Sequence, residues 1–213
     1  MKTFYTSIFI TFLTLTTFSQ IQQKIVLNQP DTSRGYTVMH ALANRASEKE
    51  YDTINLSLQD LSDLMWAANG VNRPEEKNRT APSAINGQDI DIYAFMIDGV
   101  YFYNAFDHIL ELVVEGDYRD IVAGSQYWVA DAPVICVLVS DISRFKFGDD
   151  DQRMLWAAFD AGIVSQNISV FCASVGLATR PRASMEIDKI IDLLNLTETQ
   201  HPMLNNPVGY PLK

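Results

Sequence analysis

The short segment NRASEKEY, residues 44–51, has residue types that could bind an anion. Arg45, Ser47 and Lys49 are spaced two apart, so in an extended backbone their side chains point to the same side. The arginine donates from a planar fork, the lysine carries a compact positive charge, and the serine adds a hydroxyl. Such a set suits a phosphate or a carboxylate. The alternative is an ordinary solvated surface, on which the intervening glutamates pair with neighbouring cations or the arginine follows a helix favourably.

A second segment, RTAPSAINGQ at residues 79–88, combines small residues with hydrogen-bonding side chains. Pro82, Ser83 and Ala84 form a stiff turn of small residues, which lets a flat ligand approach the backbone. Ser83 and Asn86 offer hydrogen bonds to such a ligand. Because proline, serine, asparagine and glycine are also ordinary turn residues, a simple long loop is the alternative.

A third segment, GSQYWVADAP at residues 124–133, places a polar amide beside two aromatic residues. Gln126 precedes Tyr127 and Trp128, just before a continuous apolar run. The amide could bind the edge of a ligand, or it could bond the local backbone. None of the three segments identifies a function by itself.

The rest of the chain must supply the elements that hold these segments in place. Apolar residues at helical spacing predict the helices, and small residues in the centre of the longest one suit close packing on more than one side. Strands and helices do not alternate strictly, which predicts an α+β fold. The expected helices are 36–44, 58–68, 117–123, 152–175 and 184–194, and the expected strands are 91–97, 100–104, 108–114 and 133–140.

Several boundaries have a specific signal. Ser33 is available near the start of the first helix, and Ser57 can cap the second. Gly70 and Gly176 are placed to end the second helix and the longest helix. Residues 73–88 are expected to form a loop and the tail from residue 201 an extended segment.

The first residues have the pattern of a secretory signal peptide. Lys2 precedes an apolar stretch, and Thr17 and Ser19 are small residues where a signal peptidase cleaves. The alternative of a membrane anchor is disfavoured because threonines break the apolar run, which is shorter than the roughly 20 residues of a span. We therefore expect a signal peptide at 1–19, a lead-in at 20–35 and one domain at 36–213, exported to a periplasmic or other extracytoplasmic location with no stable membrane span after cleavage.

Composition excludes several classes of function. The 213-residue chain is 47% apolar and has a formal net charge of −10, without a basic stripe, so neither nucleic acid nor an anionic membrane is an expected partner. The three histidines have no metal-ligand spacing, and we expect no metal site. Cys136 and Cys172 both lie in apolar runs and are expected to be buried, and whether they are bridged is left open.

The order of these segments resembles the FMN-dependent nitroreductase superfamily, most closely its SagB-type (azoline-oxidase-like) dehydrogenase branch. That superfamily has an Arg-x-Ser-x-Arg/Lys-x-Phe/Tyr segment after its first helix, which matches Arg45 through Tyr51. It then has a Pro-Ser-Ser/Ala segment followed by Asn-x-Gln, and RTAPSAINGQ is very similar to the SagB-branch version. The segments WVADAPVICVLVSD, AGIVSQNISVFCASVGLAT and NPVGYP resemble later parts of that branch, so the resemblance covers roughly residues 36–211.

The resemblance implies a nitroreductase-like fold, with a mixed, mainly antiparallel central sheet flanked by helices and a long central dimer helix. It implies a homodimer that binds FMN at the subunit interface. The flavin phosphate and ribityl chain would be held by the first segment, the ring would be met by the second segment from the partner subunit, and the third segment and the turn after the long helix would complete the site. The implied cofactor-binding residues are Arg45, Ala46, Ser47, Lys49, Pro82, Ser83, Ala84, Asn86, Gln126, Arg182 and Ala183.

Two departures from the family pattern matter. The turn after the long helix reads RPRASM, where Arg182 replaces a small or acidic residue and could reach the phosphate, reach the substrate or lie on the surface. Lys213 is the one cation left near the end of the chain, and we assign it no role. The altered turn motivates the alternative of a non-catalytic flavin- or ligand-binding dimeric module.

The resemblance also implies the class of chemistry, a ping-pong hydride transfer through flavin N5 to or from a small organic substrate. Nitroaromatic, quinone, enone and azoline compounds are the implied classes, and the electron donor is unknown. Export would favour a donor other than a nicotinamide. No catalytic residue is assigned, although Tyr51, Tyr127 and Arg182 are candidates for a role beside the substrate.

Overall fold

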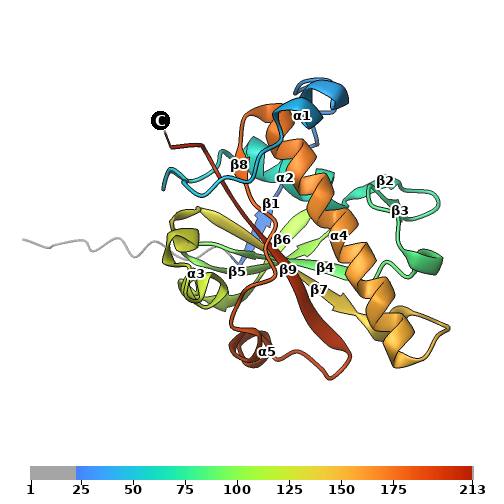
Figure 1. Ribbon diagram of the computed structural model, residues 1–213. Coiled ribbons are helices and arrows are strands. Elements are labelled where there is room, and N and C mark those ends of the chain that lie inside the picture. Colours follow the sequence, from blue (N-terminus) through green and yellow to red (C-terminus); the bar gives the residue numbers. More distant parts are fainter. Residues whose placement is uncertain (1–22, 213) are drawn as a thin grey trace, which may run out of the picture.

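The structure is a computed structural model that describes residues 23–212, so the predicted signal peptide and Lys213 lie outside the described residues. One long helix crosses a central sheet, and shorter helices lie around it (Figure 1). The helices are α1 (Val38–Asn44), α2 (Leu58–Asn69), α3 (Arg119–Ala123), α4 (Asp150–Val175) and α5 (Ile187–Leu194), with 3₁₀ turns η1 (Ala84–Asn86), η2 (Tyr127–Asp131) and η3 (Ile142–Arg144).

The main sheet has seven strands in the order β1-β6-β5-β4-β7-β9-β8, and every neighbouring pair is antiparallel. This confirms the predicted α+β class with a mainly antiparallel central sheet and a long helix. The strands of this sheet are β1 (Lys24–Val26), β4 (Ile90–Phe95), β5 (Gly99–Asn104), β6 (Ile109–Glu115), β7 (Val134–Asp141), β8 (Ala178–Thr179) and β9 (Gln200–Gly209).

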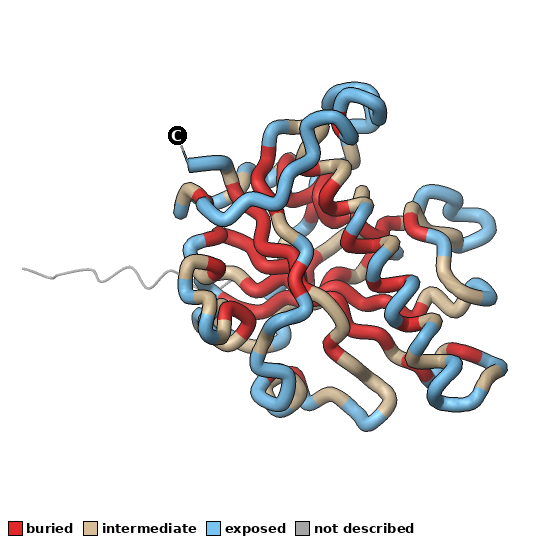
Figure 2. The backbone as a smooth tube through the Cα atoms, viewed as in Figure 1, coloured by how far each residue is buried: buried red, intermediate tan, exposed pale blue. Residues whose placement is uncertain are grey.

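The central strands are buried on both faces, which explains the continuous apolar run PVICVLVS in β7 (Figure 2). Alternate residues of a strand point to opposite faces. Cys136 and Leu138 belong to the core layer that contains α2 and α4, whereas Ile135 and Val137 belong to the layer that contains α3 and α5. The two layers of helices therefore sandwich the sheet.

The long helix α4 has strong signals at both ends. The Asp149 side chain caps it by accepting a hydrogen bond from the Gln152 N–H at 2.9 Å, and Gly176 ends it in the left-handed conformation with φ 78°. Within the described residues, α4 alone has the length and composition of a membrane span, a property shared by core helices. Its inner face packs against α1, α2, β7 and β9.

The structure corrects two expectations about local structure and confirms a third. The first helix is capped by Thr37 and not by Ser33, whose hydroxyl bonds the Asp31 carboxylate instead. The expected loop at 73–88 contains most of a separate hairpin, β2 (Val71–Arg73) with β3 (Asn78–Arg79). The expectation of an extended tail is confirmed, because most of it forms β9, which lies inside the sheet between β7 and β8.

The expected lead-in also contributes to the sheet, because β1 pairs with β6 at one edge. The Arg34 guanidinium bonds Asp60 at 2.6 Å and Asp63 at 2.8 Å, which fastens this part of the chain to α2. These ion pairs are partly buried and join one guanidinium to two carboxylates, so they specify where the lead-in lies.

Both cysteines are buried and carry free thiols in this structure. Burial raises the pKa of the Cys136 thiol to about 12, which keeps it protonated and unreactive at neutral pH. The two residues act here as small apolar side chains of the core.

Candidate functional site

Residues 45–49, which we call the cationic segment, lie exposed between the end of α1 and Tyr51. Arg45 is the C-cap residue of α1, and its N–H bonds the Ala41 carbonyl. Among the described residues, no ion pair engages Arg45 or Lys49, so the intervening glutamates do not neutralise them. Two cations and the hydroxyl of Ser47 are thus available to an anion from solution.

The cationic segment is anchored beside β8. The Glu48 N–H donates to the Thr179 carbonyl at 3.0 Å, and Tyr51 forms a β-bridge with Pro211. The Tyr51 ring is buried, and its hydroxyl donates to the Glu48 carbonyl at 3.1 Å. Burial raises the pKa of this hydroxyl, although the positive charges of Arg180 and Arg182 oppose the rise.

An aromatic and cationic layer continues from Tyr51. Its ring stacks on Trp128 with centroids 6.3 Å apart and an interplanar angle of 11°. The guanidinium carbons of Arg180 and Arg182 lie 5.8 and 6.0 Å from the centre of the Trp128 ring. This end of the molecule therefore carries a local positive field in an acidic protein, bounded by flat aromatic surfaces.

Arg182 is 6% exposed, which excludes the alternative that it is a surface residue. Its Nη1 donates to the Asn205 Oδ1 at 2.7 Å, and its Nε donates to the Gln126 Oε1 at 3.2 Å. Nη1 and Nη2 also bond the Val122 and Ala123 carbonyls. These contacts occupy four of the five N–H groups that an arginine carries. Burial lowers the pKa of the guanidinium, and the charge of Arg180 adds to this effect.

This network fixes the orientation of Gln126. Because its Oε1 accepts from Arg182, its NH₂ group is left as a donor for another partner. The neighbouring Ala183 is exposed in the turn, and the Ser184 carbonyl is held by the Asn205 amide at 3.1 Å. The structure thus brings together the cationic segment, Gln126 and the turn after α4.

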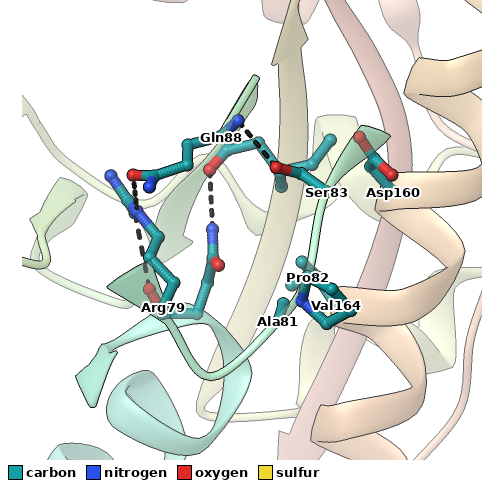
Figure 3. Close-up of a pocket in the computed structure, with 9 residues that line it drawn as sticks. Arg79, Ala81, Pro82, Ser83, Gln88, Asp160 and Val164 are labelled. Atoms are coloured by element: carbon teal, nitrogen blue, oxygen red, sulfur yellow. Dashed lines mark hydrogen bonds between the residues drawn. The ribbon is translucent and has the colours of Figure 1, made fainter. Parts of the chain in front are cut away.

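The second predicted group lies elsewhere. Residues 82–86, which we call the turn segment, lie beside the N-terminal half of α4, where Pro82 and Ser83 line a small pocket with Asp160 and Val164 (Figure 3). The Ser83 hydroxyl accepts a hydrogen bond from the Gln88 N–H at 2.8 Å. The Ala84 N–H donates to both carboxylate oxygens of Asp160, at 3.1 and 2.9 Å.

The backbone near the turn segment is strained. Ile85, Asn86 and Gln88 have φ values of 46°, 56° and 49°, a region that residues other than glycine rarely adopt. Ile85 is β-branched and 52% exposed, so burial of its side chain does not offset the backbone strain. Strain of this kind is concentrated at functional sites.

Within one chain, the two groups lie at different places along α4. Asp160 contacts the turn segment, whereas Val175 is the last residue of α4 before the strand that anchors the cationic segment. Fifteen residues at 1.5 Å rise place these points about 22 Å apart along the helix. A single chain therefore holds the cationic segment and the turn segment at separate places along α4.

Large apolar side chains are exposed on both α1 and α4. Met39 of α1 is 76% exposed and Phe159 of α4 is 59% exposed. Val38, Leu42 and Leu155 are also exposed. Large apolar side chains clustered on exposed helix faces are characteristic of a surface that another protein covers.

Sequence reasoning missed several residues that hold these groups. From the sequence, Trp128 is only a neighbour of Gln126, and neither Asn205 nor Asp160 is a candidate. Asp160 could have been noticed, since it is a charged residue on the inner face of an apolar helix. Asn205 gave no signal, because its role depends on β9 lying beside the turn after α4.

Comparison with known proteins places this geometry in context. Residues 42–210 match the model of the nitroreductase family, whose proteins generally bind FMN. A candidate nitroreductase of Methanocaldococcus jannaschii, MJ1384, is 28% identical over 79% of this chain and 88% of its own length. The NAD(P)H-dependent FMN reductase of Bacillus subtilis is 26% identical over 75% of this chain and 64% of its own length. The crystal structure of a candidate nitroreductase from Ralstonia eutropha JMP134 has a TM-score of 0.83 and 32% identity, covering 90% of this chain and 91% of that one.

Proposed function

Because the chain belongs to the nitroreductase family, we propose that it is an FMN-dependent oxidoreductase that acts on small organic molecules by a ping-pong cycle. The family places it among flavin oxidoreductases. The observation that carries the proposal for this chain is the cationic segment, whose arginine and lysine form no ion pair with any residue that the structure describes and which lies near Gln126 and Arg182. The positively charged side chains of Arg45 and Lys49 can together bind a phosphate at this site of an otherwise acidic protein.

The donor set fits FMN. Arg45, Ser47 and Lys49 offer the charge and hydrogen bonds that a flavin phosphate and ribityl chain need. The free NH₂ of Gln126 is a donor for the carbonyl or ring nitrogen edge of the isoalloxazine, and Ala183 leaves room for it in the turn. When bound, FMN supplies the hydride-transfer chemistry, which the protein itself lacks.

The chain's own residues position the cofactor and limit access to it. Trp128 and Tyr51 form an apolar wall beside the positive field, which would exclude water from one side of the ring. Tyr127, which precedes Trp128 in the chain, is exposed and is the candidate for contact with a substrate. Tyr51 is less suited to proton transfer, because burial raises its pKa and its hydroxyl is already engaged.

A homodimer would complete the site. The cationic segment and the turn segment are separated along α4 of one chain. If α4 packs antiparallel against α4 of a second copy, the cationic segment of each copy approaches the turn segment of the other. The exposed apolar faces of α1 and α4 are suited to this contact. Family members are commonly homodimers, which supports the same arrangement.

The candidate substrates are small organic electron acceptors and electron donors. Nitroaromatics, quinones and enones are candidate acceptors. Azolines are candidate donors if the SagB-type resemblance of residues 79–85 reflects shared chemistry. The second candidate function is a dimeric module that binds flavin or another ligand without turnover. The observation that favours it is the buried Arg182, which differs from the small or acidic residue of the family pattern in this turn.

Separate half-reactions distinguish the two candidates. The purified protein is mixed anaerobically with NADPH, NADH or dithionite while the flavin absorbance is followed, and the reduced protein is then mixed with a quinone or a nitroaromatic. We expect reduction by at least one donor and reoxidation by an organic acceptor at a rate that depends on acceptor concentration. A bound flavin that is not reoxidised by any organic acceptor would support the binding module.

The dimer is testable through the exposed face of α4. We expect Phe159→Asp to raise the dimer dissociation constant by at least tenfold, because a charge would replace an aromatic anchor in an apolar contact. Light scattering over a dilution series measures this change. Phe106→Asp is the matched control, since Phe106 is equally exposed but lies in the turn between β5 and β6. A flavin-loaded monomer of the unmodified protein would rule out the shared site.

A further inference from the structure

Two carboxyl groups meet in the interior below the turn segment. Asp89, just before β4, is fully buried, and Asp160, in the middle of α4, is 2% exposed. Burial, and then a hydrogen bond and the charge from the neighbouring Asp160, raise the pKa of the Asp89 carboxyl, which indicates that the two carboxyl groups are neighbours. Aspartate is almost never fully buried without a partner of opposite charge, so this pair requires a specific explanation.

The hydrogen bonds around the pair indicate which carboxyl group accepts a hydrogen bond and which one donates it. Both oxygens of Asp160 accept from the Ala84 N–H, so this residue acts as the acceptor. The Oδ2 of Asp89 accepts from the Ser140 hydroxyl, whereas its Oδ1 has no donor within the described part of the chain. A proton on Asp89, donated to Asp160, would satisfy a contact that two ionised carboxylates could not make.

No nearby arginine neutralises the two carboxyl groups in place of that proton, among the residues that the structure describes. Arg144 is committed to the Asp91 carboxylate and the Gln88 carbonyl, and Arg79 bonds Gln88. No ion pair joins either arginine to Asp89 or Asp160 among the residues that the structure describes. The other titratable groups on the surrounding elements are Asp91 in β4, Asp141 at the end of β7, and His201, which lies opposite Ser140 in β9.

We propose that Asp89 and Asp160 share one proton and that this carboxyl–carboxylate pair holds the turn segment against α4, loosening it when the proton is lost. The pair makes the turn segment a pH-sensitive part of the fold. Residues 82–84 are connected to α4 through the Ala84 N–H, and Asp160 keeps its position because Asp89 donates to it. This inference does not depend on the bound cofactor.

The direction of the pH effect follows from the buried acid. Burial raises the pKa of the Asp89 carboxyl to about 7, with the neighbouring Asp160 adding to the rise and the Ser140 hydroxyl opposing it. An unfolded aspartate has a pKa of about 4. The folded state therefore holds about one more proton than the unfolded state between these values, so stability from this pair is full below about pH 4 and falls as the pH rises towards 7.

The test compares the pH dependence of two proteins. Denaturant unfolding of the unmodified protein and of Asp89→Asn is measured from pH 5 to 8, together with hydrogen exchange of the Ala84 amide. The asparagine can donate to Asp160 and accept from Ser140 at every pH. We expect the difference in unfolding free energy between the two proteins to change with a slope approaching one proton below the folded pKa of about 7 and to level off above it. We also expect Ala84 protection to fall with pH only in the unmodified protein.

Two further measurements keep the proposal falsifiable. Asp192→Asn, which changes an exposed carboxylate on α5, should follow the unmodified protein. If Asp89→Asn does not fold, infrared spectroscopy of the unmodified protein should show a protonated carboxylic acid at pH 6 that disappears by pH 8, and Ser140→Ala should move this loss to higher pH. Equal pH dependence in the unmodified protein and Asp89→Asn, or no protonated acid at pH 6, would overturn the proposal.

Discussion

Replacing Arg45 by alanine is expected to weaken FMN binding by roughly tenfold to a hundredfold, the effect of losing one charge-assisted contact to a phosphate. The reason is that Arg45 has no ion-pair partner in the described structure, so its charge is free for the ligand. Riboflavin lacks the phosphate, and its affinity should change little. The ratio of FMN to riboflavin affinity, measured by quenching of flavin fluorescence, isolates the phosphate contact from any general loss of structure.

Arg73→Ala is the matched control, because Arg73 is also an exposed arginine but lies in β2, away from the cationic segment. It should leave both affinities unchanged. If Arg45→Ala lowers FMN and riboflavin affinity equally, the cationic segment does not seat the phosphate. If it changes neither, residues 45–49 are a solvated surface.

The second large effect is expected at Arg182. Its replacement by alanine leaves the Val122 and Ala123 carbonyls and the Asn205 side chain without their donor in the interior. Each unpaired buried group costs about 1–3 kcal/mol, so we expect the free energy of unfolding to fall by about 3 kcal/mol or more. Denaturant unfolding at fixed pH measures this loss.

Arg180→Ala provides the comparison. Arg180 lies over the same Trp128 ring but is only partly buried, and a cation–π contact at such a site is worth about 0.5–1 kcal/mol. A loss for Arg182→Ala no larger than that for Arg180→Ala would contradict the network as described. Arg182→Lys should recover only part of the stability, because an ammonium cannot reproduce the fork that bonds Gln126 and Asn205 together.

Much of the fold could be predicted because its signals are local. The Ser57 cap and the Gly176 stop each depend on residues close in sequence, and the structure confirms them. The buried strand β7 was also predictable, because a short continuous apolar run suits a strand covered on both faces. The order of the segments further predicted the family, which the match over residues 42–210 confirms.

The parts that could not be predicted depend on contacts distant in sequence. The burial of Arg182 follows from β9, whose Asn205 exchanges two backbone hydrogen bonds with it. The capping of α1 by Thr37 was missed because Ser33 finds a closer partner in Asp31. The contact of Asp89 with Asp160 joins residues 71 positions apart, and no spacing rule predicts it.

The claim that this protein binds FMN is tested most directly by the visible absorption spectrum of the purified protein, followed by chromatography of the cofactor released on denaturation. We expect a flavin spectrum, and we expect the released compound to be FMN, with one FMN for each subunit of a dimer. A colourless protein that also fails to bind added FMN would show that the fold is retained without the cofactor, and would contradict the proposed oxidoreductase.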